Sequence, residues 1–526
     1  MMRLSLVTWP ATPQLFSLIA LALLPRVGMA QAQPPISSPS TNLPAEWRRG
    51  RELAEKYCVA CHLLPEPDSL TKGAWAHYIQ PEMAKWLGVE PVDYEGMADG
   101  KILQQAAIYP PSPIIPEDDW FAIWDYYRAA APSRLPAAQR TTPTLGLKQF
   151  RVHKINHHQG VPMTTLVKID PPQKRMFVGD AYGGSLFILN AAGEVTSRAR
   201  MGSPPVGLFP RDTGFFLTLI GRFFPSDATE GAVTWLPAGS GLAEPRSVLE
   251  QLRRPTHCVA ADLNQDGRED LVVCCYGNRL GNFSWFERRA DGEYDEHVLL
   301  ERAGAVRADV RDYNGDGLPD ILVLMAQARE GLFLFLNEGK GRFRMETVLE
   351  KPPTWGMAGF DVADFNRDGH WDLVVANGDH GDFPLPLKPY HGIRIYLNDG
   401  HNHFTEVFTY PMTGAYQVVA RDFDQDGDLD LAAIAFYPDF PSGKPQSFVY
   451  LENRGDWKFE PFTCAEQDAG RWLVMDAGDV DGDGDVDLVL GSFVRGPTTI
   501  PVPLSLREQW RTQGAALLLL ENVGRR

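Results

Sequence analysis

The residues best suited to chemistry lie together near the start of the chain, in the run Cys58-Val59-Ala60-Cys61-His62. Two thiols separated by two residues can form thioethers with the two vinyl groups of a porphyrin, and a histidine that follows at once can ligate the iron. This run therefore predicts one covalently bound c-type haem held by Cys58, Cys61 and His62. A zinc site would need a second CxxC, which the chain lacks. A thioredoxin-like CxxC would begin a helix, whereas this one follows a helical run.

Two helices are expected to position the motif. The first runs from Glu46 to Tyr57 and leads into Cys58. The second opens at Pro116, and acidic residues follow in its first turn. Its apolar face is made of Trp120, Ile123, Trp124 and Tyr127. A small residue lets two helices cross closely, so Gly50 is expected to face Trp124 or Tyr127.

A helix, CVACH, a polar loop and an aromatic C-terminal helix together resemble the class I cytochromes c over residues 45–135. The resemblance implies a small all-α cytochrome c domain whose sixth iron ligand lies between the two helices and is usually a methionine. Met83 is the favoured candidate. Met97, His77 and an open iron position are the alternatives. A methionine ligand would raise the reduction potential relative to two histidines.

Residues 1–32 have the layout of a secretory signal. An apolar run from Leu15 to Leu24 precedes small residues, and cleavage is predicted near Ala30 or Ala32. The run is too short to span a membrane, which takes about 20 apolar residues. We therefore expect a periplasmic or secreted protein with no membrane span after signal removal. Residues 33–44, rich in proline and serine, are expected to form a flexible leader.

The net charge of −17 disfavours nucleic acids and anionic membranes as partners. Six cysteines include the two of the CVACH motif. The other four are too sparse for a disulfide scaffold, and we expect them to be buried thiols: Cys258, Cys274, Cys275 and Cys464. A bridge from Cys258 to Cys274 or Cys275 is the alternative.

A nine-residue acidic loop occurs five times in the second half of the chain. Each copy carries Asp at positions one, five and nine, Asp or Asn at position three, and Gly at position six. Alternating oxygen side chains around a tight turn suit calcium, and magnesium suits such a cage less well. Up to five calcium ions are expected, at Asp262, Asn264, Asp266, Asp270, Asp312, Asn314, Asp316, Asp320, Asp364, Asn366, Asp368, Asp372, Asp422, Asp424, Asp426, Asp430, Asp479, Asp481, Asp483 and Asp487.

These loops are not EF-hands, because position 12 is apolar and strand-like runs flank each copy. An apolar strand ending in Asn and Gly follows each of the last four loops, as in Leu334 to Asn337. The combination resembles the FG-GAP or VCBS repeats of integrin α-chain β-propellers over residues 256–526. The resemblance implies blades of four strands, with the calcium loops joining strands one and two.

Two further periods between Gly146 and Arg254 keep the strand pattern without the acidic loop. The expected fold is therefore mainly β: a seven-bladed β-propeller at residues 147–526, preceded by the small all-α domain and a linker at 136–146. The last period lacks its outer strand, and residues 148–152 resemble that strand. They are expected to pair with the last blade and so remove an open sheet edge.

Three functions are open at this stage. The first is an exported electron carrier whose haem exchanges electrons with a redox protein or a small donor or acceptor, and whose propeller docks a partner. The second is an oxidoreductase with a substrate site on the long aromatic loops opposite the calcium loops. The third is an adhesion module that binds a protein or polysaccharide on that face. The loops could equally cap the blade cores. The histidines His153, His157 and His158 are expected to be solvated, with a metal site as the lesser alternative.

Overall fold

The computed structural model describes residues 44–157, 160–239, 241–496 and 499–524. The predicted signal and most of the leader lie outside them. Ala45–Arg526 form one compact unit. Within the described residues, no helix combines the length and the apolar character needed to cross a membrane.

The N-terminal part of this unit is helical, as expected. Its helices are α1 (Ala45–Tyr57), α2 (Lys72–Ala74), α3 (Gln80–Trp86), α4 (Gly100–Ala106) and α5 (Glu117–Ala130), with a π-helical turn, η3 (Trp75–Ile79), between α2 and α3. The predicted boundaries of α1 and α5 are confirmed to within one residue at Glu46 and Pro116.

Helices α1 and α5 cross closely at Gly50. A Cβ atom on Gly50 would lie 2.3 Å from the carbonyl oxygen of Ala122 and 2.6 Å from Cβ of Tyr126. Gly50 thus allows the close crossing of α1 and α5, as predicted. It faces Ala122 and Tyr126, however, and not Trp124 or Tyr127. These two rings are buried and lie tilted against Trp75, with centroids 6.4 and 4.5 Å away.

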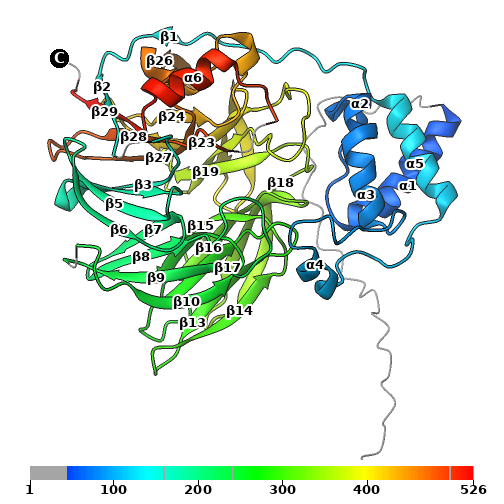
Figure 1. The fold of residues 1–526 in the computed structure, drawn as a ribbon, viewed down its shortest axis with the longest axis horizontal. Coiled ribbons are helices and arrows are strands. Elements are labelled where there is room, and N and C mark those ends of the chain that lie inside the picture. The colour runs from blue at the N-terminus through cyan, green and yellow to red at the C-terminus, as the bar shows by residue number, and fades with distance from the viewer. Residues whose placement is uncertain (1–43, 158–159, 240, 497–498, 525–526) are drawn as a thin grey trace, which may run out of the picture. The chain divides into compact units, whose positions relative to one another are not determined.

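Seven antiparallel sheets follow, which confirms the predicted seven-bladed β-propeller (Figure 1). The first three blades are β3 (Thr164–Asp170), β4 (Arg175–Asp180), β5 (Ser185–Asn190) and β6 (Val195–Arg200); β7 (Pro205–Arg211), β8 (Gly214–Leu219), β9 (Gly231–Pro237) and β10 (Arg246–Leu252); and β11 (Pro255–Ala261), β12 (Asp270–Cys275), β13 (Asn282–Arg288) and β14 (Tyr294–Leu300). Blades four and five are β15 (Ala305–Arg311), β16 (Asp320–Met325), β17 (Glu330–Asn337) and β18 (Phe343–Lys351); and β19 (Met357–Ala363), β20 (Asp372–Asn377), β21 (Gly392–Asn398) and β22 (Phe404–Pro411).

Blades six and seven each take a strand from the N-terminal side of the propeller. Blade six is β23 (Ala415–Arg421), β24 (Asp430–Ala435), β25 (Phe448–Asn453) and β26 (Phe459–Thr463), with β1 (Thr144–Leu145) paired in parallel to β26. Blade seven is β27 (Trp472–Gly478), β28 (Asp487–Ser492) and β29 (Leu517–Asn522), completed by β2 (Phe150–Ile155).

The pairing of β2 with β29 confirms the predicted closing strand. The strands are antiparallel, with Phe150 opposite Asn522 and Ile155 opposite Leu517, and Figure 1 shows them side by side. Strand β1, in contrast, lies within the residues assigned to the linker. Two residues are too few to show a periodicity, so this strand could not be read from the sequence.

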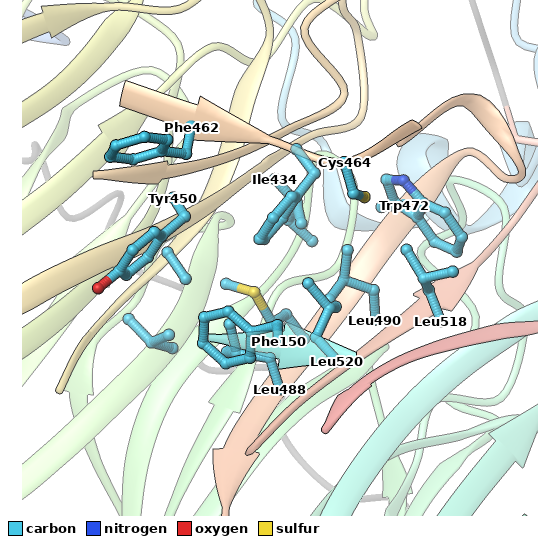
Figure 2. Packing of buried hydrophobic residues seen from close by; sticks show 14 of the residues in the cluster. Phe150, Ile434, Tyr450, Phe462, Cys464, Trp472, Leu488, Leu490, Leu518 and Leu520 are labelled. Carbon is cyan, nitrogen blue, oxygen red and sulfur yellow. The ribbon is translucent and has the colours of Figure 1, made fainter. Parts of the chain in front are cut away.

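The blade interfaces are apolar. Between blades six and seven, Phe150, Trp472 and Leu518 from three different strands pack together with other buried side chains (Figure 2). The four cysteines outside the CVACH motif are free and buried, as expected by default. Cys258 lies opposite Val273 across β11 and β12, and His257 lies opposite Cys274.

Candidate functional site

The CVACH motif begins where α1 ends. Cys58 starts a short 3₁₀ turn, and the amide of Cys61 donates to the carbonyl of Cys58 over 3.3 Å. Nδ1 of His62 lies 2.8 Å from the carbonyl oxygen of Leu63. In the tautomer in which Nδ1–H donates to this oxygen, Nε2 keeps its lone pair for a metal. The partly or fully exposed thiols of Cys58 and Cys61 and this imidazole fit covalent haem attachment.

The aromatic face of α5 and a tryptophan of η3 hold the segment that follows His62. The hydroxyl of Tyr127 donates to the carbonyl of Pro65 over 2.7 Å. Nε1 of Trp75 donates to the carbonyl of Pro67 over 2.8 Å. These two bonds fix the loop that carries the Leu63 carbonyl, and so restrict how the His62 ring can turn.

The three candidates for a sixth ligand lie in different surroundings. Met83 is half-buried in α3, and His77 is exposed in η3. Met97 is half-buried just before α4. It adjoins a cavity of about 600 Å³ lined by Tyr94, Glu95, Met97, Asp99, Gly100, Lys101, Ile102 and Gln104. Met83 is not part of that lining, and the choice between the two methionines stays a prediction.

All five acidic loops join the first and second strands of their blades, in blades three to seven. The position-one carboxylate folds each loop: Oδ2 of Asp262, for example, accepts from the amide of Gly267 over 2.9 Å. The position-six glycine has a positive φ in every copy, from 82° in Gly317 to 97° in Gly427. A side chain would strain that conformation, which accounts for glycine there.

Two of these loops gather three carboxylates. Oxygens of Asp422, Asp424 and Asp426 lie within 4.8 Å of one another, and so do those of Asp479, Asp481 and Asp483. Oδ1 of Asp422 is buried and accepts no hydrogen bond. Converging anionic oxygens with an orphaned acceptor among them fit a hard cation such as calcium.

The position-nine carboxylates also bond the acidic loop to the third strand within a blade, which the sequence did not predict. In blade four, Oδ2 of Asp320 accepts from the amide of Tyr313 over 2.9 Å, and Oδ1 accepts from the amide of Asn337 over 2.7 Å. Asp372 and Asp487 make the same pair of bonds. Burial raises the pKa of Asp320 to about 6 and that of Asp430 to about 7.

The recurring Asn-x-Gly after the third strand has a matching role. Nδ2 of Asn337 donates to the carbonyl of Leu263 in the preceding blade over 2.8 Å, and its Oδ1 accepts from the amide of Gly339. Nδ2 of Asn522 likewise donates to the carbonyl of Phe423 over 2.7 Å. The sequence shows this signature, but only the structure shows that it links neighbouring blades.

The long connections between strands two and three lie on the opposite face from the acidic loops, because successive strands alternate in direction. Phe223 stacks on Phe493, with centroids 4.5 Å apart. Phe436, Tyr437 and Phe440 pack in the same buried cluster. In blade seven the connection contains α6 (Leu504–Gln513). These aromatic residues thus cap one end of the blades, while Phe224 stays about half exposed.

The connection 378–391 of blade five buries several polar side chains. Lys388, His380 and His391 are nearly inaccessible, as is Glu330 of β17. Burial raises the pKa of Glu330 to about 8, and burial together with the charge of Lys388 lowers the pKa of His380 to about 4. Glu330 accepts from the amides of Gly356 and Met357.

The helical region contacts the propeller through these same connections. Oδ2 of Asp99 accepts from the hydroxyl of Ser226 over 2.6 Å and from the amide of Asp227 over 2.8 Å. The hydroxyl of Tyr390 lies 3.2 Å from the carbonyl oxygen of Ser69. The helical region therefore lies against the face opposite the acidic loops.

The histidines His153 and His157 contact different carboxylates. His153 lies 2.7 Å from a carboxylate oxygen of Glu521. The expectation that His157 is solvated is wrong: its ring packs against Phe187 and lies buried 3.6 Å from Asp180. His158 lies outside the described residues.

The repeat region matches a known family. Residues 262–323 and 312–375 match the family described as FG-GAP-like repeat. The chain contains FG-GAP-like repeats.

Two curated proteins match part of the chain. The chain is 32% identical over 164 residues to cartilage acidic protein 1 of Xenopus tropicalis, covering 30% of this chain and 24% of that protein. It is 26% identical over 263 residues to the Homo sapiens protein of the same name, covering 45% and 37%. The chain spans between a quarter and just over a third of the length of the curated relatives it matches. Among solved structures, it matches the WD40 domain of Toxoplasma gondii coronin with a TM-score of 0.43 and 11% identity, over 73% of this chain and 90% of that one.

Proposed function

We propose that this protein is an exported c-type cytochrome that transfers electrons through one covalent haem, and that its propeller is a calcium-stabilised scaffold that docks the redox partner. The observation that carries the proposal is the placement of Cys58, Cys61 and His62 at the end of α1, with Nδ1 of His62 on the Leu63 carbonyl. A bound haem would supply one-electron oxidation and reduction. The chain's own residues would attach it, orient its histidine ligand and present it to a partner.

The calcium part of the proposal rests on the loops. Asp422, Asp424 and Asp426 would bind one ion, and the other loops would bind theirs through the corresponding positions. Because Asp430 and its counterparts also bond the second strand of each blade to the third, an ion bound beside them would stiffen the blade. Calcium would thus stabilise the scaffold and would take no part in the redox step.

The visible spectrum tests the haem. The protein is produced with a periplasmic haem-attachment system and purified, and its spectrum is recorded with and without dithionite. A Soret band that stays with the denatured chain and sharpens on reduction is expected. The Cys58→Ala/Cys61→Ala double variant should lose it, and a colourless wild-type protein would refute the proposal. Met83→Leu and Met97→Leu, compared by their long-wavelength methionine-to-iron band and reduction potential, would identify the sixth ligand.

An oxidoreductase is the second candidate, favoured by one observation. The connection 378–391, which buries Lys388, His380 and His391, also carries the contact of Tyr390 with the helical region. A substrate bound on the exposed surface of this connection, at Pro384, would lie close to the haem-bearing part. Haem reduction by an added organic donor that saturates with donor concentration, and that the Lys388→Met variant lacks, would support this candidate over a simple carrier.

A further inference from the structure

The five acidic loops differ in what stands at position seven, although all share the same pattern at positions one, five and nine. The position-seven residues are Arg268, Leu318, His370, Asp428 and Asp485. In an oxygen cage of this kind position seven offers its main-chain carbonyl to calcium, so its side chain is free to vary. In the loop of blade three that side chain turns back onto the cage.

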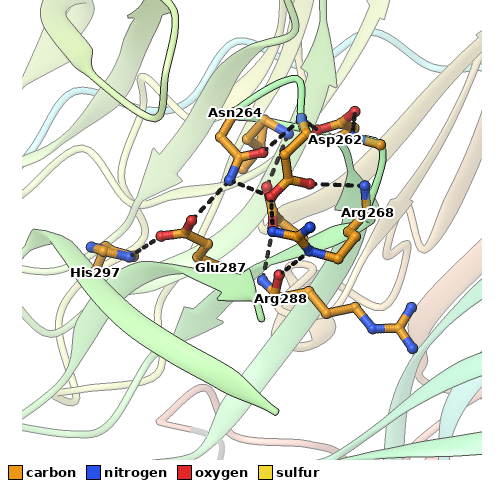
Figure 3. A network of polar contacts seen from close by, with 10 residues as sticks. Asp262, Asn264, Arg268, Glu287, Arg288 and His297 are labelled. Carbon is orange, nitrogen blue, oxygen red and sulfur yellow. Dashed lines mark hydrogen bonds and ion pairs between the residues drawn. The ribbon is translucent and has the colours of Figure 1, made fainter. Parts of the chain in front are cut away.

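Arg268 pairs with a carboxylate of its own loop (Figure 3). Its Nη2 donates to Oδ2 of Asp266 in a close contact, and its Nε donates to the carbonyl of Arg288 over 2.8 Å. The main-chain amide of Arg268 takes the other oxygen, Oδ1 of Asp266, over 2.9 Å. Two nitrogens of the Arg268 side chain, Nε and Nη2, are therefore hydrogen-bonded, and both carboxylate oxygens of Asp266 accept from Arg268.

Asn264, at position three, also donates to the position-five carboxylate. Its Nδ2 donates to Oδ2 of Asp266 over 3.1 Å and to Oε1 of Glu287 over 3.0 Å. Glu287 in turn lies 3.0 Å from Nε2 of His297, as Figure 3 shows. Asn314 and Asn366 bond their position-five carboxylates in the same way. The guanidinium of Arg268 is therefore the feature that is specific to the blade-three loop.

The other loops, all of which are described, contain no basic side chain that forms an ion pair with a carboxylate of its own loop. Arg367, at position four of the blade-five loop, points away and pairs with Asp428 of blade six over 2.9 Å. Leu318 is uncharged. Asp428 and Asp485 add a fifth carboxylate to loops that already have four. The loops of blades three, four and five carry the same set of three aspartates and one asparagine at positions one, three, five and nine. Only the ion pair of Arg268 therefore sets the blade-three loop apart from the other two.

We propose that Arg268 takes the place of calcium in blade three, so that the loop 262–270 is closed by its own side chain and binds no ion. A calcium ion bound by Asp266 would lie beside the Arg268 guanidinium, and the two positive charges would repel each other. The inference rests on the proposal that the remaining loops bind calcium.

Calcium stoichiometry tests the inference on the full-length holoprotein. The protein is stripped of bound metal with EGTA. One sample is then titrated with calcium by isothermal titration calorimetry, and a second is dialysed against millimolar calcium for elemental analysis. The wild type is expected to bind no more than four ions. Arg268→Leu, which copies Leu318 of the blade-four loop, should bind one more ion than the wild type, and Leu318→Arg should bind one fewer. Arg289→Leu is the matched control and should bind the same number as the wild type, because Arg289 pairs with Asp291 and Asp295 outside the acidic loops.

Each outcome has a separate meaning. Five ions in the wild type, or an unchanged number in Arg268→Leu with an unchanged circular dichroism spectrum, would overturn the role of Arg268. No ion in any variant, including Arg268→Leu, would instead refute the calcium part of the proposed function. The Arg268→Leu variant is expected to fold, because Leu318 occupies the same position in blade four.

Discussion

The main-chain nitrogen of Asn522 donates a hydrogen bond of 2.7 Å to Oδ1 of Asp487. Through this bond the position-nine carboxylate of the last acidic loop holds β29, the strand that pairs with β2 to complete blade seven. The side chain of Asn522 bonds the Phe423 carbonyl of blade six as well. Asn522 thus bonds β29, the partner of the closing strand β2, to its own blade and to blade six.

Replacing Asn522 should weaken that closure. Asn522→Ala leaves the buried carbonyls of Phe423 and Val486 without their donor, which costs about 1–3 kcal/mol for each unsatisfied group. We expect a lower free energy of unfolding in urea. The control Gln513→Ala, on the exposed end of α6, should leave it unchanged. Equal stabilities of Asn522→Ala and wild type would show that the links between blades contribute little.

The crossing of α1 and α5 should tolerate no larger residue at Gly50. In Gly50→Ala, the added methyl would meet the Ala122 carbonyl at 2.3 Å, so the helices must move apart at a cost of about 1–3 kcal/mol. Scanning calorimetry should show a lower Tm for the helical region. Gly73→Ala is the matched control, because a Cβ there meets nothing within 4 Å. A Tm for Gly50→Ala as high as that of the control would contradict the observed packing.

His380 should make stability depend on acid pH. Burial lowers its pKa to about 4, below the value of about 6.5 expected in the unfolded chain. The unfolded chain therefore takes up a proton at His380 more readily than the folded protein does. The free energy of unfolding keeps its full value above pH 6.5 and falls by about 3 kcal/mol in all as the pH drops towards 4. Urea unfolding at pH 7, 6, 5 and 4 should show a shallower loss for His380→Asn than for wild type. The exposed His401→Asn should follow the wild type, and parallel curves for all three proteins would refute the assignment.

Asp99 should hold the helical region against the propeller. In Asp99→Asn the new side chain still tolerates the left-handed backbone at this residue, where φ is 57°. It loses the negative charge that pairs with Arg222 and that accepts from the Ser226 hydroxyl and the Asp227 amide. Loss of a charged hydrogen bond should raise amide exchange in residues 220–230 by about tenfold. Asp93→Asn is the control, since Asp93 caps only its own turn at Glu95 and Gly96. Unchanged exchange in 220–230 would show that other contacts carry the interface.

The repeats made the propeller predictable. A strand pattern repeated seven times fixes the number of blades, and the leftover strand at one end of the chain identifies Phe150 to Val152 as its complement. The same regularity placed every acidic loop between strands one and two. The motif Cys58 to His62 was equally local, so the sequence placed it at the end of α1 without any knowledge of tertiary contacts.

What the sequence could not predict depends on contacts between distant residues. The partner of Gly50 depends on the crossing angle of two helices, which no single-helix pattern contains. The pairing of Thr144 with Phe462 depends on where the linker runs, and the burial of Lys388 depends on how a long connection folds back. The contact of Arg268 with Asp266 could not be predicted either. The loop pattern sets no requirement on the side chain at position seven, so it does not indicate where that side chain points.

The pairing of β2 with β29 also orders events during synthesis. His153 and Leu519 are partners in the same sheet, so β2 leaves the ribosome more than three hundred residues before the strand it needs. Contacts this distant in sequence form slowly. Helices α1 and α5, in contrast, pack on each other and are both synthesised before the first blade, so their contact can form much earlier. The segment that leads into Cys58 and Cys61 can therefore take up its helical structure while the ring is still open.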